Sequence, residues 1–116
     1  MSHAIPDLMA ANLLRIFNER NRRRRAAAIR AIYAKDCFFA DEGESVSGWE
    51  GLHDRVDRLH SAHPGFVFQA SGPAVGHHGI VCQRWRFGPP EAHDVITGID
   101  VAIFENGSIK ALIRLH

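Results

Sequence analysis

Two aspartates in this sequence stand where a carboxyl group could move a proton. Asp100 lies between Ile99 and Val101 in an apolar, strand-like run, and Asp41 ends the run Cys37–Asp41. Removal from water raises the pKa of a carboxyl group, so that it can act as a general base or a hydrogen-bond donor near neutral pH. Structural alternatives stay open at this point. Asp100 can be satisfied by a hydroxyl or a backbone amide, and Asp41 can be a solvated acid in a turn.

The eight histidines raise the question of a metal site. His60 and His63 are three residues apart near the end of a predicted helix, and His77 and His78 are adjacent between glycines. A protein metal site needs three or four converging ligands, and we find neither an H-E-x-x-H motif nor a carboxylate at matching spacing. We therefore expect no metal and no organic cofactor. Either His60 or His63 is expected to reach a pocket and polarise a ligand.

The charge balance argues against binding to nucleic acid or to anionic lipid. Fourteen Lys and Arg face thirteen Asp and Glu, for a net charge of +1. The run Arg22–Arg25 is the exception, but no aromatic residues interleave with it and no further basic surface extends it. Four cations at a helix start oppose the helix macrodipole. We expect them to be exposed in a solvated turn and first helical turn.

Length and composition predict one domain over residues 1–116, since 116 residues with 46% hydrophobic content can bury a core. No apolar run approaches the ~18 residues of a membrane span. The segment Met1–Asp7 lacks the basic start and apolar core of a signal peptide. Cys37 and Cys82 lie in apolar runs, which favours free thiols in a reducing compartment. We expect a cytoplasmic protein.

The elements that must position these residues follow an α+β plan. Hydrophobic spacing predicts helices over 7–20, 24–35 and 49–60. Ser47 and Glu50 have the spacing of a capping box at the third helix. Alternation and turn residues predict strands over 37–41, 66–70, 79–87, 93–105 and 108–115. Asn106-Gly107 predicts a tight hairpin between the last two strands.

Both faces of the strand over 93–105 are largely apolar, so both should be covered. One face carries Val95, Thr97, Ile99, Val101 and Ile103, and the other carries Ile96, Gly98, Asp100, Ala102 and Phe104. In the last strand one face carries Ile109, Ala111, Ile113 and Leu115. The helices can cover only one face, so we predict a homodimer through the outer sheet face. Small side chains at Gly98 and Ala102 leave room for a cavity beside Asp100.

Four stretches resemble the nuclear transport factor 2-like superfamily, more narrowly its SnoaL-like and ketosteroid-isomerase-like branch. They are YAKDCFFAD, VSGWEGL, SGPAVGHHG and DVAIFENGSIKAL, at 33–41, 46–52, 71–79 and 100–112. The resemblance covers about residues 8 to 115. It implies a cone-shaped barrel, in which a curved, mostly antiparallel sheet packs on three N-terminal helices (a cystatin-like fold). It also implies a deep apolar pocket and a homodimer.

The resemblance assigns roles to particular residues. It places Asp41 at the base position of the isomerases and Asp100 at the position of their protonated acid. Phe17 falls at the position of the oxyanion-hole tyrosine, whose loss typically costs about 2.7–4 kcal/mol of transition-state stabilisation. Tyr33 matches a supporting tyrosine, and Val56 replaces another. In the polyketide-cyclase relatives a single pocket acid works without the tyrosine, as Asp100 could do.

The resemblance also directs Gln83 and Trp85 of the middle strand toward the pocket. Trp49 begins the predicted third helix, where we expect it either to close the pocket mouth or only to pack. The Asp-Arg-Asp set of the epoxide-hydrolase relatives has no match that we find. Two functions follow. The first is acid/base catalysis beside a carbonyl, such as isomerisation or cyclisation, on a small hydrophobic substrate. The second is a non-catalytic module for small-molecule binding or dimerisation.

Overall fold

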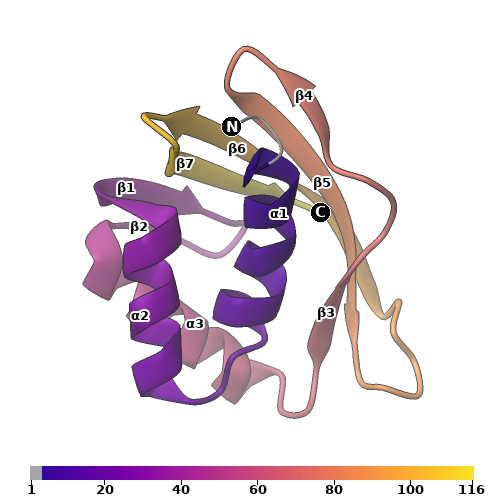
Figure 1. Cartoon of the computed structure of the whole chain (residues 1–116). Coiled ribbons are helices and arrows are strands. Elements are labelled where there is room, and N and C mark those ends of the chain that lie inside the picture. The colour runs from indigo at the N-terminus through magenta and orange to yellow at the C-terminus, as the bar shows by residue number, and fades with distance from the viewer. Residues whose placement is uncertain (1–3) are drawn as a thin grey trace.

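The computed structural model describes residues 4–116 and has helices on one side of a curved sheet (Figure 1). Helix α1 (Ala4–Ala11) continues into a π-helical segment, η1 (Asn12–Phe17), and is followed by α2 (Arg22–Ile32) and α3 (Gly48–Ala62). The strands are β1 (Tyr33–Ala40), β2 (Ser45–Ser47), β3 (Val67–Ala70), β4 (Val75–His77), β5 (Ile80–Gly88), β6 (Ile96–Glu105) and β7 (Ser108–Leu115).

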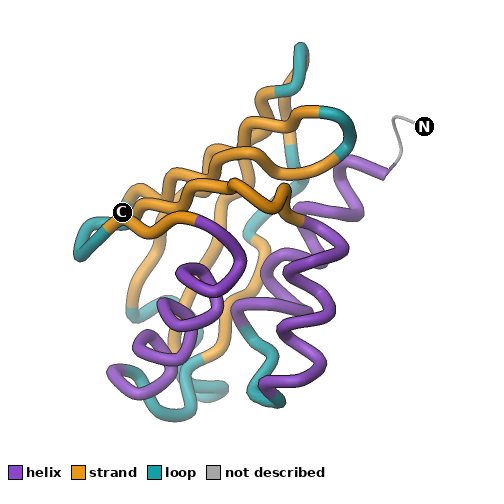
Figure 2. The backbone as a smooth tube through the Cα atoms, turned by 90° about the vertical axis from the view of Figure 1, so that its left-hand side faces the viewer, coloured by secondary structure: helices purple, strands orange, loops and turns teal. Residues whose placement is uncertain are grey.

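The sheet is mixed and does not close. Its strand order is β2-β1-β7-β6-β5-β3, with β4 paired to β5. Only β1 and β7 are parallel, and the other pairs are antiparallel. Seen from the side, the strands curve over the helices, which cover the concave face (Figure 2). The predicted α+β architecture of three helices and a curved sheet is therefore confirmed, as an open cone.

Two predicted boundaries were wrong for local reasons. The second helix ends at Ile32, because Tyr33 is already extended (φ −103°, ψ 144°) and starts a strand longer than predicted. The short strands β2 and β4 were not predicted, since each has three residues that are mostly exposed. Ser47 does occupy the N-cap position of α3, but its side chain makes no capping hydrogen bond.

The arginine run is not a purely solvated turn, and this corrects our expectation. Arg25 is fully buried between α2 and α3. Its Nη1 donates to the Glu19 carbonyl at 2.8 Å, its Nε lies 3.3 Å from His53 Nδ1, and its Nη2 pairs with Asp57. Arg22 pairs with the same aspartate. The run therefore attaches α2 to α3, because Asp57 of α3 accepts hydrogen bonds or ion pairs from Arg22 and Arg25.

The predicted hairpin between β6 and β7 is present, but a bulge changes the faces of β7. Asn106 and Gly107 both have positive φ (53° and 82°), as a type I′ turn requires. The register shifts between Ile103 and Phe104. As a result Ile109 is fully buried, whereas Leu115 on the outer face is exposed. The prediction that Ile109 shares the face of Ala111, Ile113 and Leu115 was wrong.

The inner face of the sheet forms one apolar core with the helices. Asp100 and Ala102 of β6 are fully buried, and Trp85 and Phe87 of β5 are nearly so. Cys37 is buried and Cys82 is half-buried, and both are free. Over residues 4–116, no helix is long and apolar enough to cross a membrane, and no cluster of three or more His, Cys, Asp or Glu could hold a metal ion.

Candidate functional site

A cavity of about 220 Å³ opens between the end of α3, the β1–β2 turn and the inner face of the sheet. One part of its wall is apolar, from Leu59, Phe68, Trp85, Phe87 and Ile96. The other part is polar, from Asp41, Glu42, Arg55, His63, Arg114 and His116, with Gly43 in the turn. Such a combination of aromatic surface and few polar groups is typical of a small-molecule site.

Asp100 does not line this cavity, because it lies behind Arg114 in a buried ion pair. Arg114 Nε donates to Asp100 Oδ1 and Arg114 Nη2 donates to Asp100 Oδ2, both at 2.8 Å. The indole Nε1 of Trp85 also donates to Asp100 Oδ1 at 2.8 Å. Both residues are buried: the exposed fraction is 0% for Asp100 and 5% for Arg114. Such a two-point pair fixes the plane of the guanidinium group.

Aromatic rings surround the Arg114 guanidinium and complete its environment. Its Cζ lies 4.0 Å from the ring centre of Phe17, 4.5 Å from that of Phe68 and 5.3 Å from that of Trp85. The ring faces attract the cation where water is excluded. The remaining nitrogen, Nη1, is buried and has no hydrogen-bond partner. Arg114, whose side chain lines the cavity, therefore keeps one nitrogen without a hydrogen-bond partner.

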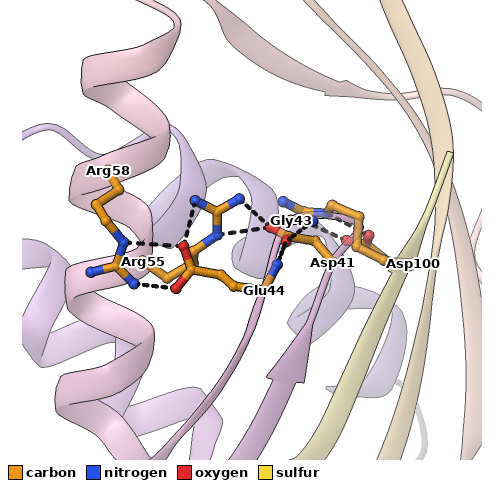
Figure 3. Close-up of polar contacts among 7 residues, drawn as sticks. Asp41, Gly43, Glu44, Arg55, Arg58 and Asp100 are labelled. Atoms are coloured by element: carbon orange, nitrogen blue, oxygen red, sulfur yellow. Dashed lines mark hydrogen bonds and ion pairs between the residues drawn. The ribbon is translucent and has the colours of Figure 1, made fainter.

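Asp41 also lines the cavity and is tied into a second network (Figure 3). Its Oδ1 accepts from the backbone N–H of Gly43 at 2.9 Å and of Glu44 at 3.0 Å. Its Oδ2 accepts from Arg55 Nε at 2.8 Å, and Arg55 Nη2 lies 2.7 Å from the same oxygen in an ion pair. Glu44 continues the network through Arg58. Asp41 thus shapes the β1–β2 turn and anchors it to α3.

The family of the chain follows from its sequence match. The model of the SnoaL-like domain family matches residues 12–112, which includes every strand as far as the middle of β7 and most of the cavity wall. The chain belongs to the SnoaL-like domain family. A comparison with curated proteins returned no match.

Solved structures of the same fold extend over the whole SnoaL-like chain. A proposed isomerase of the SnoaL-like family from Agrobacterium tumefaciens superposes with a TM-score of 0.86 at 23% identity, over 99% of this chain and 97% of that one. A proposed polyketide cyclase from Sinorhizobium meliloti gives 0.77 at 14% identity, over 98% of each chain. A protein with a ketosteroid isomerase-like fold from Catenulispora acidiphila, solved with trimethylamine, gives 0.76 at 13% identity, over 96% and 85%. These likenesses show the fold.

Four of the predicted pocket residues of the SnoaL-like chain lie in packed core. Phe17, Tyr33, Val56 and Ala102 are each at most 1% exposed, and none lines a cavity described above. The Tyr33 hydroxyl donates to Asn12 Oδ1 at 2.6 Å. Burial, with the nearby Asp100 charge as a smaller cause, holds the pKa of Tyr33 well above its usual range. Tyr33 is therefore a neutral, structural donor.

Gly98 does not leave room beside Asp100, contrary to our expectation. A Cβ at this position would lie 2.4 Å from the Leu115 carbonyl oxygen and 2.5 Å from Cζ2 of Trp85. The indole of Trp85 occupies the space that a side chain at Gly98 would take, and from there it reaches Asp100. The glycine thus serves the close packing of a ring that lines the cavity.

The other predicted pocket residues divide between separate places. Trp49 lines a different cavity between α2 and α3, and its Nε1 donates to the Tyr33 carbonyl at 2.9 Å. Gln83 is buried and donates to the Gly72 carbonyl at 2.9 Å. His60 Nε2 lies 2.7 Å from the Phe17 carbonyl oxygen, and burial lowers the pKa of His60. Of the two histidines considered, His63 lines the cavity beside Arg114.

Sequence reasoning did not find Arg114, although it is central to the site. One signal was available, since strand alternation places Arg114 opposite in direction to Ile113 and Leu115. Counting back from the Asn106-Gly107 turn pairs Asp100 with Ile113, but the bulge moves Asp100 opposite Arg114. The pairing of the acid with the base therefore depends on one extra residue in β7.

Proposed function

We propose that this SnoaL-like protein binds a compact, largely apolar molecule in the cavity, with an oxygen of that molecule accepting from Arg114 Nη1. One observation carries the proposal: Nη1 is a buried donor without a partner, on a side chain that lines the cavity. A buried polar group left unpaired costs about 1–3 kcal/mol. A ligand oxygen that pairs with Nη1 would remove this cost.

The charges around the cavity favour a neutral carbonyl compound over an anion. Arg114 is already neutralised by Asp100, and Arg55 by Asp41. Glu42 adds a negative charge at the rim. A carboxylate ligand would gain a hydrogen bond from Arg114 but would meet no net positive charge. A ketone or similar carbonyl gains the same hydrogen bond and loses less hydration on entering the aromatic cavity.

Acid/base chemistry beside the carbonyl is the activity that this contact supports. A donor held on the carbonyl oxygen stabilises negative charge that develops there when a neighbouring carbon loses its proton. The second candidate is a non-catalytic pocket. The hydrogen bonding of the two aspartates favours this candidate, because the carboxylate oxygens of Asp41 and Asp100 already accept hydrogen bonds from protein donors.

Binding of small probes tests the proposal. We expect cyclohexanone to show saturation transfer from the protein in ligand-detected NMR, and cyclohexanecarboxylate to bind more weakly. Ile96→Trp should abolish the ketone signal by filling the cavity, without touching the Arg114–Asp100 pair. Val75→Trp, on the exposed outer side of β4, is the matched control and should bind normally. Ketone binding that survives Ile96→Trp would contradict the proposed site.

We also propose that a second copy of this chain covers the outer sheet face. Apolar side chains remain exposed there, including Phe38 at 40%, Ile80 at 50%, Ile103 at 42% and Leu115 at 52%. Exposed apolar surface of this kind is typical of an interaction site. Sedimentation velocity should show a dimer, and Ile103→Lys should give a monomer. A monomeric parent protein at high concentration would contradict the proposal.

The thiols support a proposed cytoplasmic location. Cys37 and Cys82 are both free, and such thiols persist best in a reducing compartment. Burial raises the pKa of the Cys37 thiol, which keeps it protonated and unreactive. Fractionation of the source cells would test the location directly.

A further inference from the structure

We propose that His63, rather than either aspartate, takes and returns the proton in this cavity. The inference rests on the proposed function, because it needs a carbonyl compound on Arg114. It assigns the base to a residue at the end of α3.

His63 is held in a fixed place at the cavity wall. Its backbone N–H donates to the Leu59 carbonyl at 3.0 Å, and its own carbonyl accepts from Phe66 N–H at 3.2 Å. Its ring centre lies 5.0 Å from that of Phe66 and 5.3 Å from that of Phe87. The side chain is half-buried and lines the cavity. Among the side-chain hydrogen bonds found over residues 4–116, none engages its ring nitrogens.

The acids at the cavity are poor alternatives. An ionised carboxylate has about four lone-pair sites, and Asp41 already accepts three hydrogen bonds, from two backbone N–H groups and from Arg55 Nε. Asp100 also accepts three and does not reach the cavity. Donors therefore already occupy most of the acceptor sites of both carboxylates, which leaves little room for a proton from a ligand.

Two further groups at the cavity can accept a proton but are less well placed. Glu42 and His116 both line the cavity and are exposed to solvent. Neither is held between aromatic rings as His63 is, although His116 lies 6.0 Å from the Trp85 ring. A general base contributes most when it is fixed within reach of the proton that it removes. His63 is the titratable group that combines cavity exposure with a fixed ring.

The proposed step balances without any added reagent. The neutral imidazole of His63 removes a proton from the carbon next to the carbonyl. The electron pair of that C–H bond forms the carbon–carbon double bond, and the carbonyl pair moves onto oxygen, where Arg114 Nη1 donates. The imidazolium then returns a proton to the same carbon or, where the ligand is unsaturated next to that carbon, to the far end of the conjugated system. In D₂O the imidazolium first trades its N–H proton for a solvent deuteron, so the first return gives exchange, and the second gives an isomer.

Exchange of the protons beside a carbonyl tests this step without knowledge of the natural substrate. In buffered D₂O, the intact protein should accelerate the loss of the α-proton NMR signal of cyclohexanone above the buffer rate. His63→Gln should reduce this acceleration by about 10²-fold or more, as expected for loss of a general base. His60→Gln, one turn earlier on α3, should leave it unchanged.

The outcomes separate the two proposals. Exchange that survives His63→Gln, or that is lost in Asp41→Asn, Glu42→Gln or His116→Gln instead, would overturn the role of His63. Ketone binding without accelerated exchange would overturn it too, while leaving the proposed function intact. Absence of ketone binding would overturn both. His63→Ala provides a further check, because added imidazole should restore exchange if the lost group is a base, and should not if His63 only packs.

Discussion

The Arg114 guanidinium holds the Asp100 carboxylate through two nitrogens, each 2.8 Å from an oxygen, with both side chains at most 5% exposed. Removal of one partner from such a pair leaves the other charge buried and unpaired, which costs about 3–5 kcal/mol. We expect Asp100→Asn to lower the free energy of unfolding by this amount in urea titrations.

The same pair offers its own control. The double variant Asp100→Leu with Arg114→Met removes both charges, so it should be much less destabilised than Asp100→Asn. The exposed pair Asp36 and Lys110 gives a second control, and Asp36→Asn should leave the urea midpoint almost unchanged. A double variant as unstable as the single one would mean that packing, not charge, dominates at this place.

Gly98 should not tolerate a methyl group. Gly98→Ala would push against the Leu115 carbonyl and the Trp85 ring, and overpacking of this kind typically costs about 1–3 kcal/mol. The displaced indole should also change the Trp fluorescence spectrum. Gly51→Ala is the milder comparison, because the added Cβ would lie 3.3 Å from Val46 Cβ, a contact that a shift of a few tenths of an ångström relieves, and the helix gains propensity. Equal stability of both variants would contradict the close packing of Trp85.

Tyr33 should remain protonated in the folded protein at a pH where tyrosines normally ionise. Burial raises its pKa, so the folded state keeps the proton when the unfolded state has lost it. The resulting stability is present below pH ~10 and falls as the pH rises above that value. Tyr33 is the sole tyrosine, so absorbance at 295 nm reports it alone. We expect tyrosinate to appear only together with unfolding; a separate native titration near pH 10 would contradict this.

His53 and His60 should make the protein less stable in mild acid. Burial lowers the pKa of both side chains below the usual 6.5, so the unfolded state binds protons first as the pH falls. The free energy of unfolding should therefore decline below pH ~6.5 and level off below the folded-state pKa values. His60→Gln can still donate to the Phe17 carbonyl and should reduce this slope. A slope unchanged in His60→Gln would exclude a contribution from His60.

The sequence was sufficient for the architecture because hydrophobic periodicity sets it. The apolar spacing of α3 and the alternation of β6 identified their buried faces, including the inward direction of Asp100. Turn chemistry was equally informative, since Asn106-Gly107 adopts the positive φ values that its residue types favour.

The candidate site was less predictable because it depends on long-range pairing. Asp41 and Arg114 line one cavity although they are far apart in the sequence, and no local sequence pattern connects them. The bulge near Ile103 moves the register by one residue, which changes the neighbour of Asp100 from Ile113 to Arg114. Arg25 shows the same limit, because helical propensity could not indicate that Asp57 and His53 would bury it.

The parallel pairing of β1 with β7 also sets an order of events during synthesis. Tyr33 in β1 pairs with Ile109 in β7, so most of the chain must emerge from the ribosome before β1 can join the rest of the sheet. Until then the aromatic rings of Phe17 and Phe39 lack their contact with the Arg114 guanidinium group. Such distant contacts slow folding. The nascent polypeptide therefore exposes an apolar surface that a chaperone could hold until β7 arrives.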